Sequence, residues 1–264
     1  MIGSISDNEI EKARRVLADH TVKRADHESA LECLLWCIAS QALGWEPASR
    51  FVYTLRRLSR PDDSKATLIV SKRDVLSDNG KVYQASIEAH LRFAKGRRFE
   101  SAIDYFGSLK GEWWGNIVNA NPDDRVHYVD NVKWVGEKTF SFYHICMGGV
   151  NLLALDVHVM RGLNRLGIEL DENYVIPRAR STDAQKVRKT PDRKDYIRIE
   201  SEAREFFSGD ERFKVNGKVD MALVDAVLWW RGASRGDSDQ GYLFDGGLRS
   251  GAMPYSIGFS SVSR

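Results

Sequence analysis

The chain has few cysteines, no long apolar run and no secretory signal. Three cysteines among 264 residues argue against a disulfide scaffold and agree with a reducing compartment. No stretch approaches the roughly 18 apolar residues of a membrane span, and the N-terminal MIGSISDNEIEKARR lacks the charged and then apolar form of a signal peptide. We therefore expect an intracellular protein that does not act at a membrane.

The three cysteines, Cys33, Cys37 and Cys146, lack the spacing of a four-thiolate cluster or of a zinc site. Cys33 and Cys37 fall on one face of an apolar helix. We interpret all three as thiols of the core, with metal ligands as the alternative. No metal and no organic cofactor is expected.

Strand-like alternation is also scarce, and no internal repeat is visible. With 42% hydrophobic residues, the chain can form a large helical core or two small lobes. A capping-box pattern at Ser6 to Glu9 indicates the start of a first helix. These features predict an all-α protein.

The most informative segment begins at Asn121-Pro122-Asp123-Asp124, which has the form of a helix start: an Asn cap, Pro at the first helical position and acids in the first turn. We expect a short helix over roughly 122–131. The sequence Val132 to Glu137 then breaks the pattern, with Gly136 free to take a conformation barred to other residues. An apolar, aromatic-rich helix follows from Thr139 to Met147.

This helix, hairpin and helix can bind a phosphate without reading a base. A hairpin that leads into a helix N-terminus points backbone N–H groups and a positive dipole end outward. The candidates for contact with a nucleic-acid backbone are Val132, Lys133, Trp134, Val135 and Gly136.

Lys138 and Asp156 add chemistry to this element. Lys138 lies in the first turn of the second helix, where the positive dipole end disfavours an ammonium and favours the nucleophilic amine. Asp156 precedes an amphipathic helix and is expected to cap it. A carboxylate there can stabilise an oxocarbenium-like centre or assist deprotonation of the amine.

The sequence GEKTF, followed 18 residues after its lysine by the aspartate of LDVHVMR, resembles the helix-hairpin-helix DNA glycosylase superfamily. In that family the hairpin reads roughly LPGVGxKTA and the downstream motif VDxHVxR. The resemblance implies that Lys138 is the Schiff-base lysine and Asp156 the catalytic aspartate. The resemblance is strong over about a sixth of the chain and weak in the order of the surrounding helices.

Two departures from the family pattern matter. Lys133 replaces the hairpin proline and Trp134 the first hairpin glycine, so the phosphate contact is expected to be made differently. The iron–sulfur cysteine set of the endonuclease III branch is absent.

A second resemblance concerns the selected base. VDMALVDAVLWWRG is similar to the pocket-forming helix of the archaeal GO glycosylases, which remove 8-oxoguanine. The matching positions, Asp225 and Trp229, share a helix face and together offer a hydrogen-bond acceptor and a stacking surface. The alternative is that Trp229 and Trp230 fill the core and Asp225 pairs with an arginine.

Near the N-terminus, SQA followed by a loop and a helix resembles the start of the family's catalytic core. The matching glutamine of several members enters the duplex near the vacated base, which implies a gap-filling or base-contacting role for Gln41. The alternative is an ordinary polar residue at a helix end. Trp45, in the adjacent loop, is a candidate stacking residue.

The formal net charge of +2 is modest for a DNA-binding protein. Basic residues nevertheless cluster at 92–98 and 178–194, where either a solvated basic face or phosphate contact explains them.

The resemblance implies a two-lobed all-α glycosylase fold with an interlobe cleft. We expect N-terminal helices at 1–46 that join the hairpin-side lobe, and a helical lobe at 47–120. The catalytic lobe spans 121–232, with a polar insertion near 171–195, and an irregular tail spans 233–264.

The sequence thus predicts a monomeric base-excision repair enzyme that acts on double-stranded DNA containing a damaged base, with 8-oxoguanine as the first candidate. It is expected to be bifunctional: a glycosylase that also nicks the strand as an AP lyase, through a lysine Schiff base. The alternatives are a glycosylase for another damaged, mismatched or hypermodified base, and a non-catalytic helix-hairpin-helix DNA-binding protein.

Overall fold

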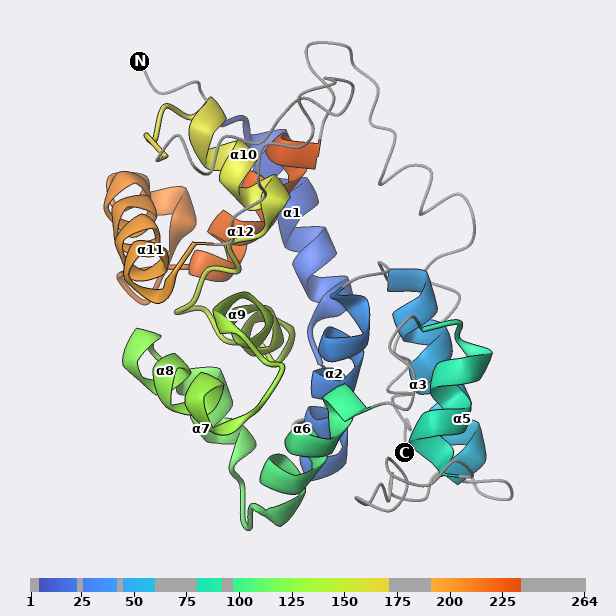
Figure 1. The fold of residues 1–264 in the computed structure, drawn as a ribbon. Helices are drawn as coiled ribbons and strands as arrows, with labels where there is room; N and C mark the ends of the chain where they lie inside the picture. The colour runs from blue at the N-terminus through green and yellow to red at the C-terminus, as the bar shows by residue number, and fades with distance from the viewer. Residues whose placement is uncertain are drawn as a thin grey trace, which may run out of the picture. The chain divides into compact units, whose positions relative to one another are not determined.

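The computed structural model describes residues 5–22, 26–41, 45–59, 80–91, 97–170 and 191–233. These residues are mostly helical (Figure 1), which confirms the expected all-α class. Contacts group them into two units. The hairpin unit comprises the described residues from His20 to Gly149, and the Asp156 unit comprises those before His20 and from Val150 onward. The predicted boundaries at 46, 120 and 232 stay a prediction.

The hairpin unit is built around helix α2 (His27–Ser40), whose residues from Ser29 to Ala39 are all buried. Asp26 caps α2 by accepting a hydrogen bond from the Ser29 N–H at 2.8 Å. Helix α2 packs against α3, α6 and α9. The other helices of the unit are α3 (Trp45–Ser59), α5 (Lys81–Glu88), α6 (Arg97–Ser108), α7 (Trp114–Asn119), α8 (Pro122–Asn131) and α9 (Glu137–Cys146).

Aromatic rings join α6, α8 and α9. Tyr128 stacks on Phe106 with ring centroids 5.9 Å apart and on Phe140 at 4.7 Å. Tyr143 meets Phe106 edge-on at 6.0 Å. Offset and edge-on pairs of this kind add to the free energy of burial, so the helices on both sides of the predicted hairpin are fixed by packing.

His144 is fully buried on α9. Its Nδ1 lies 2.6 Å from the carbonyl oxygen of Ile117, to which it donates when it carries the proton. Burial, and more weakly the nearby charge of Arg125, lower the pKa of His144 to about 4. The ring is therefore neutral near pH 7.

The Asp156 unit contains α1 (Asp7–His20) as far as Asp19, α10 (Val157–Arg165), α11 (Arg193–Phe207), the 3-10 helix η3 (Glu211–Phe213), strands β1 (Lys214–Val215) and β2 (Lys218–Val219), and α12 (Met221–Ala233). Helix α1 begins with the expected capping box: the Ser6 N–H donates to the Glu9 carboxylate at 2.8 Å, and the Glu9 N–H donates to the Ser6 hydroxyl at 3.3 Å. One apolar core extends over α1, α10, α11 and α12.

Two glycines bring α10 and α12 into backbone contact. A Cβ atom at Gly162 would lie 2.3 Å from the carbonyl oxygen of Leu228, and one at Gly232 would lie 1.7 Å from that of His158. No side chain fits at either position. The spacing of α10 and α12 is therefore set by glycine.

A small hairpin precedes α12, which the scarcity of strand-like alternation did not predict. Lys214 pairs with Val219 and Val215 with Lys218, in antiparallel register. The turn residues Asn216 and Gly217 have φ of 51° and 75°, the positive values that a two-residue hairpin turn needs. An Asn-Gly pair is the sequence signal for such a turn.

Several expectations lie outside the described residues: those for 171–190, for the tail from 234 onward and for residues 92–96 of the first basic cluster. The predicted insertion reaches 195, but α11 already begins at Arg193, because the Asp192 side chain caps it by accepting from the Asp195 N–H at 3.0 Å. Among the helices described, none is both long enough and apolar enough to cross a bilayer.

Candidate functional site

The predicted hairpin, residues 132–136, lies between α8 and α9. Asn121 caps α8 by accepting from the N–H groups of Asp123 and Asp124, and the Asp124 side chain accepts from the Asn121 N–H, which confirms the predicted helix start. Val132 and Val135 are buried and joined by a hydrogen bond of 3.2 Å. These two apolar side chains anchor the turn.

Trp134 takes the left-handed backbone conformation in this turn, with φ of 71°, and its side chain is 60% exposed. It occupies the position where the family motif has glycine. The sequence led us to expect the special conformation at Gly136, but Gly136 has φ of −92° and ψ of 176°, which any residue adopts. The turn therefore places backbone strain on a tryptophan.

Gly136 instead leaves the N-terminus of α9 open. As N-cap it offers no side-chain hydrogen bond to the first turn, whereas Asn121 and Asp156 cap α8 and α10. A Cβ atom at Gly136 would meet no atom within 4 Å. Backbone N–H groups at an uncapped helix start suit a phosphate oxygen.

Polar contacts brace the turn from outside. The Gln41 amide donates to the Thr139 hydroxyl at 2.6 Å and to the Trp134 carbonyl at 3.3 Å. The Lys133 N–H donates to the Ser101 hydroxyl at 2.8 Å, so it is engaged within the protein, while the Lys133 side chain is exposed. Sequence reasoning missed Ser101 and Thr139, because only the fold brings them to the turn.

Lys138 lies in the first turn of α9 and is half-buried. Its Nζ lies 5.5 Å from the centroid of the Phe142 ring, one turn further along the helix. Phe142 in turn packs against the buried Trp36, with ring centroids 5.8 Å apart. The ammonium group thus has an aromatic neighbour that is itself held by the core.

Asp156 caps α10, as expected. Its Oδ1 accepts hydrogen bonds from the N–H groups of His158 and Val159, both at 2.8 Å. Among the described residues, Oδ2 of Asp156 accepts none. One carboxylate oxygen therefore holds the helix start while the other is available for a second task.

Side chains of α11 and α12 hold the extended segment 152–155 that leads to Asp156. The N–H groups of Leu153, Ala154 and Leu155 donate in turn to Glu200, Asp225 and Tyr196, at 2.7, 2.8 and 2.9 Å. The Tyr196 hydroxyl also donates to the Leu153 carbonyl at 2.7 Å. These buried N–H groups, which have no strand neighbour, are thereby satisfied, and Asp156 is held in place.

The predicted base-pocket residues have different surroundings. Asp225 is buried and its Oδ1 receives the Ala154 N–H. Trp229 is half-buried on the same helix, and its ring lies 5.2 Å from that of His158. Trp45 begins α3, and its side chain lies outside the described residues.

The candidate residues fall into two groups. Gln41, the hairpin and Lys138 belong to the hairpin unit, where Gln41 contacts the hairpin directly. Asp156, Asp225 and Trp229 belong to the Asp156 unit, where Asp225 holds the segment that ends at Asp156. Each unit thus carries one of the two residues expected to do chemistry.

No protein-family model and no curated protein matches the chain. Among solved structures, the chain is similar to the crystal structure of Tm1821, the 8-oxoguanine DNA glycosylase of Thermotoga maritima. The two share 18% sequence identity over 85% of this chain and 86% of the other, with a TM-score of 0.52. At this identity the likeness shows a shared fold, so the chain has the all-α fold that its motifs predicted.

Proposed function

We propose that the protein is a base-excision repair glycosylase that flips a damaged base out of double-stranded DNA and cleaves its N-glycosidic bond. The main support for this proposal is the position of Lys138. It lies in the first turn of α9, directly after a strained turn and an uncapped helix start. A protein that only holds DNA backbone needs the helix start but not the lysine. The fold shared with an 8-oxoguanine glycosylase supports the proposal.

In the proposed reaction, the neutral amine of Lys138 attacks C1′ of the flipped nucleotide. The N-glycosidic bond breaks, and the base leaves with the bonding electron pair and takes up a proton. The sugar ring opens to give an imine with Lys138. Loss of a proton from C2′ then expels the 3′ phosphate and nicks the strand, which is the AP lyase step.

Asp156 supports this attack in the proposal. Its Oδ1 is engaged at the start of α10, and its Oδ2 has no hydrogen bond among the described residues. A carboxylate so placed stabilises positive charge that develops on the sugar, or takes the proton from the attacking amine. Both roles depend on the negative charge of the Asp156 carboxylate, so a neutral residue that still caps α10 tests them.

We propose 8-oxoguanine as the first substrate to examine, with Asp225 and Trp229 near the extruded base. Trp229 is half-buried and retains exposed ring surface that can stack. Asp225 already accepts the Ala154 N–H, so its part in selecting the base includes holding the segment next to Asp156. A panel of lesions is therefore needed beside 8-oxoguanine opposite cytosine.

The test uses duplex oligonucleotides with single lesions, with and without borohydride. A covalent adduct and a nick at one lesion are expected, and Lys138→Gln should abolish both. Lys110→Gln is the matched control, because it removes a charge from an exposed lysine of the same unit and should leave the adduct unchanged.

The same assay separates the alternatives. Adducts at another damaged, mismatched or hypermodified base would keep the glycosylase and change its substrate. Tight binding of every duplex without adduct, base release or nick would replace the proposal with a non-catalytic DNA-binding protein.

A further inference from the structure

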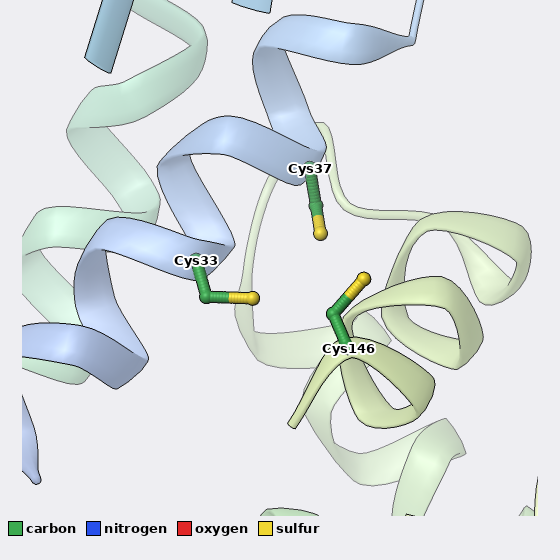
Figure 2. A group of neighbouring side chains, drawn as sticks. All are labelled: Cys33, Cys37 and Cys146. Carbon is green, nitrogen blue, oxygen red and sulfur yellow. The ribbon is translucent and has the colours of Figure 1, made fainter. Parts of the chain in front are cut away.

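The three cysteines of the chain converge inside the hairpin unit. Cys33 and Cys37 project from α2 and Cys146 from the end of α9, and Figure 2 shows their sulfurs pointing toward a common space. All three Sγ atoms lie within 4.8 Å of one another, and all three residues are buried. The spacing in sequence had suggested core thiols, because it cannot show that α2 and α9 pack together.

The distances suit a metal ion bound by sulfur. When three sulfurs lie within 4.8 Å of one another, some point is no more than about 2.8 Å from each, and metal–thiolate bonds are about 2.3 Å long. The thiols thus need to move inward by only about half an ångström, which small rotations of the side chains provide.

The composition of the group selects the kind of ion. Within the described part of the chain, no fourth His, Cys, Asp or Glu completes the group, and burial keeps water from the sulfurs. Structural zinc sites in proteins have four ligands. An ion that accepts three sulfurs and no other ligand, such as monovalent copper, fits the group better.

Polar and basic groups lie around the three cysteines. The Tyr143 hydroxyl is fully buried and has no hydrogen-bond partner among the described residues. Burial, followed by the neighbouring thiols, raises the pKa of the Tyr143 hydroxyl. Lys138 and His20 lie close enough to act electrostatically on Cys146. The sulfurs lose their protons when they bind a metal.

We propose that Cys33, Cys37 and Cys146 form a closed, sulfur-only site for a thiophilic metal ion of low coordination number, for which monovalent copper is the probe. Each thiol that binds the ion releases one proton to solvent. The bound ion joins α2 to α9 and so stabilises the helix whose first turn contains Lys138. The proposal is independent of the proposed reaction, since the three sulfurs take no part in it.

The experiment titrates the reduced full-length protein anaerobically with monovalent copper against a competing chelator. One ion per chain is expected, with the ultraviolet charge-transfer absorption of copper–thiolate bonds and a copper X-ray absorption spectrum that fits a shell of sulfur alone. Thermal unfolding should shift to higher temperature when copper is present.

Cys33→Ser, Cys37→Ser and Cys146→Ser should each lower the affinity at least tenfold. Ile145→Val is the matched control, because it trims the buried neighbour of Cys146 and keeps every thiol. Retention of all copper by the chelator, or a shell containing nitrogen or oxygen, would overturn the proposal. The X-ray absorption measurement on the unaltered protein decides the question if the serine variants do not fold.

Discussion

At the residue scale, the left-handed backbone conformation of the hairpin turn falls on Trp134, and Gly136, where the sequence suggested it, does not adopt it. Trp134 holds the left-handed conformation, and Gly136 holds an ordinary extended one. A side chain in the left-handed region costs about 1–2 kcal/mol, so an exposed tryptophan there is retained at the expense of stability. Backbone strain at a candidate binding turn points to a role for the ring in binding.

Trp134→Gly should therefore raise the free energy of unfolding by about 0.5–1 kcal/mol, since relief of strain outweighs the greater freedom of glycine in the unfolded chain. Urea unfolding measures the change. Lys133→Gly is the control, because Lys133 is exposed and has no positive φ, and it should lower stability by about 0.5–1 kcal/mol. An equal fall in the free energy of unfolding for Trp134→Gly and Lys133→Gly would show that the backbone at Trp134 is not strained.

Gly136→Ala should leave folding intact and weaken DNA binding. The added methyl group meets no protein atom, and φ is compatible with alanine, so stability should be unchanged or slightly higher. The methyl would nevertheless stand where a phosphate approaches the start of α9.

Fluorescence anisotropy with a labelled duplex is the measurement for Gly136→Ala, and we expect the affinity to fall about tenfold, or about 1.4 kcal/mol. Gly209→Ala is the control: its Cβ also meets nothing, and Gly209 belongs to the other unit. Equal affinities for the two variants would argue against phosphate binding at α9.

Asp156→Asn separates the structural and chemical parts of this carboxylate. Asparagine caps helices as well as aspartate does, so the free energy of unfolding should change by less than about 0.5 kcal/mol. The proposed reaction needs the negative charge, and base release should slow by about 10²–10⁴-fold. Single-turnover rates measure the effect, and an unchanged rate would remove Asp156 from the chemistry.

At the element scale, the helix starts were predictable and the distant contacts were not. Asn121-Pro122 and Asp156 carry local capping signals, and α8 and α10 begin where these signals indicate. The cluster of Cys33, Cys37 and Cys146 and the bracing of the hairpin by Gln41 depend on the packing of α2 against α9. Such contacts join residues about a hundred positions apart, and no local pattern encodes them.

The contacts of segment 152–155 were also not predictable from the local sequence. Asp156 was expected to cap the helix that follows, but the buried extended residues before it have no sheet neighbour and need hydrogen-bond partners that only the folded chain reveals. Those partners are Tyr196 and Glu200 on α11 and Asp225 on α12, and nothing in the local sequence links them to this segment. Asp225 was singled out for the base, and its bond to the Ala154 N–H was not foreseen.

Gly232→Ala should disrupt the pairing of α10 and α12. The new Cβ would overlap the carbonyl oxygen of His158, which is backbone and cannot rotate away. Overpacking of this kind costs about 1–3 kcal/mol or more, and it displaces the helix that Asp156 begins. The temperature of thermal unfolding and the rate of base release should therefore both fall. Gly115→Ala, whose Cβ meets nothing, is the control and should be tolerated.

At the scale of the whole molecule, stability in mild acid depends on His144. Its pKa is about 4 in the folded protein and about 6.5 in the unfolded chain, so between these values the unfolded chain binds more protons. Stability associated with His144 is present above pH 6.5 and is lost as pH falls toward 4. The loss amounts to about 3 kcal/mol.

His144→Asn tests this dependence, because its amide can replace the donor to the Ile117 carbonyl without a titrating ring. Chemical unfolding from pH 7 to pH 4 should show a steeper loss of stability for the unaltered protein than for the variant. Parallel curves would mean that His144 titrates normally.

The segment that ends at Asp156 also sets a rule for redesign. Three consecutive N–H groups are matched one to one by three different side chains, so sliding the segment by a single residue would mismatch every bond. A strand in a sheet can slip and find equivalent partners, but this segment cannot. Libraries that diversify α11 and α12 to change the base that the proposed enzyme excises should therefore keep Tyr196, Glu200 and Asp225 constant and vary the exposed positions around them.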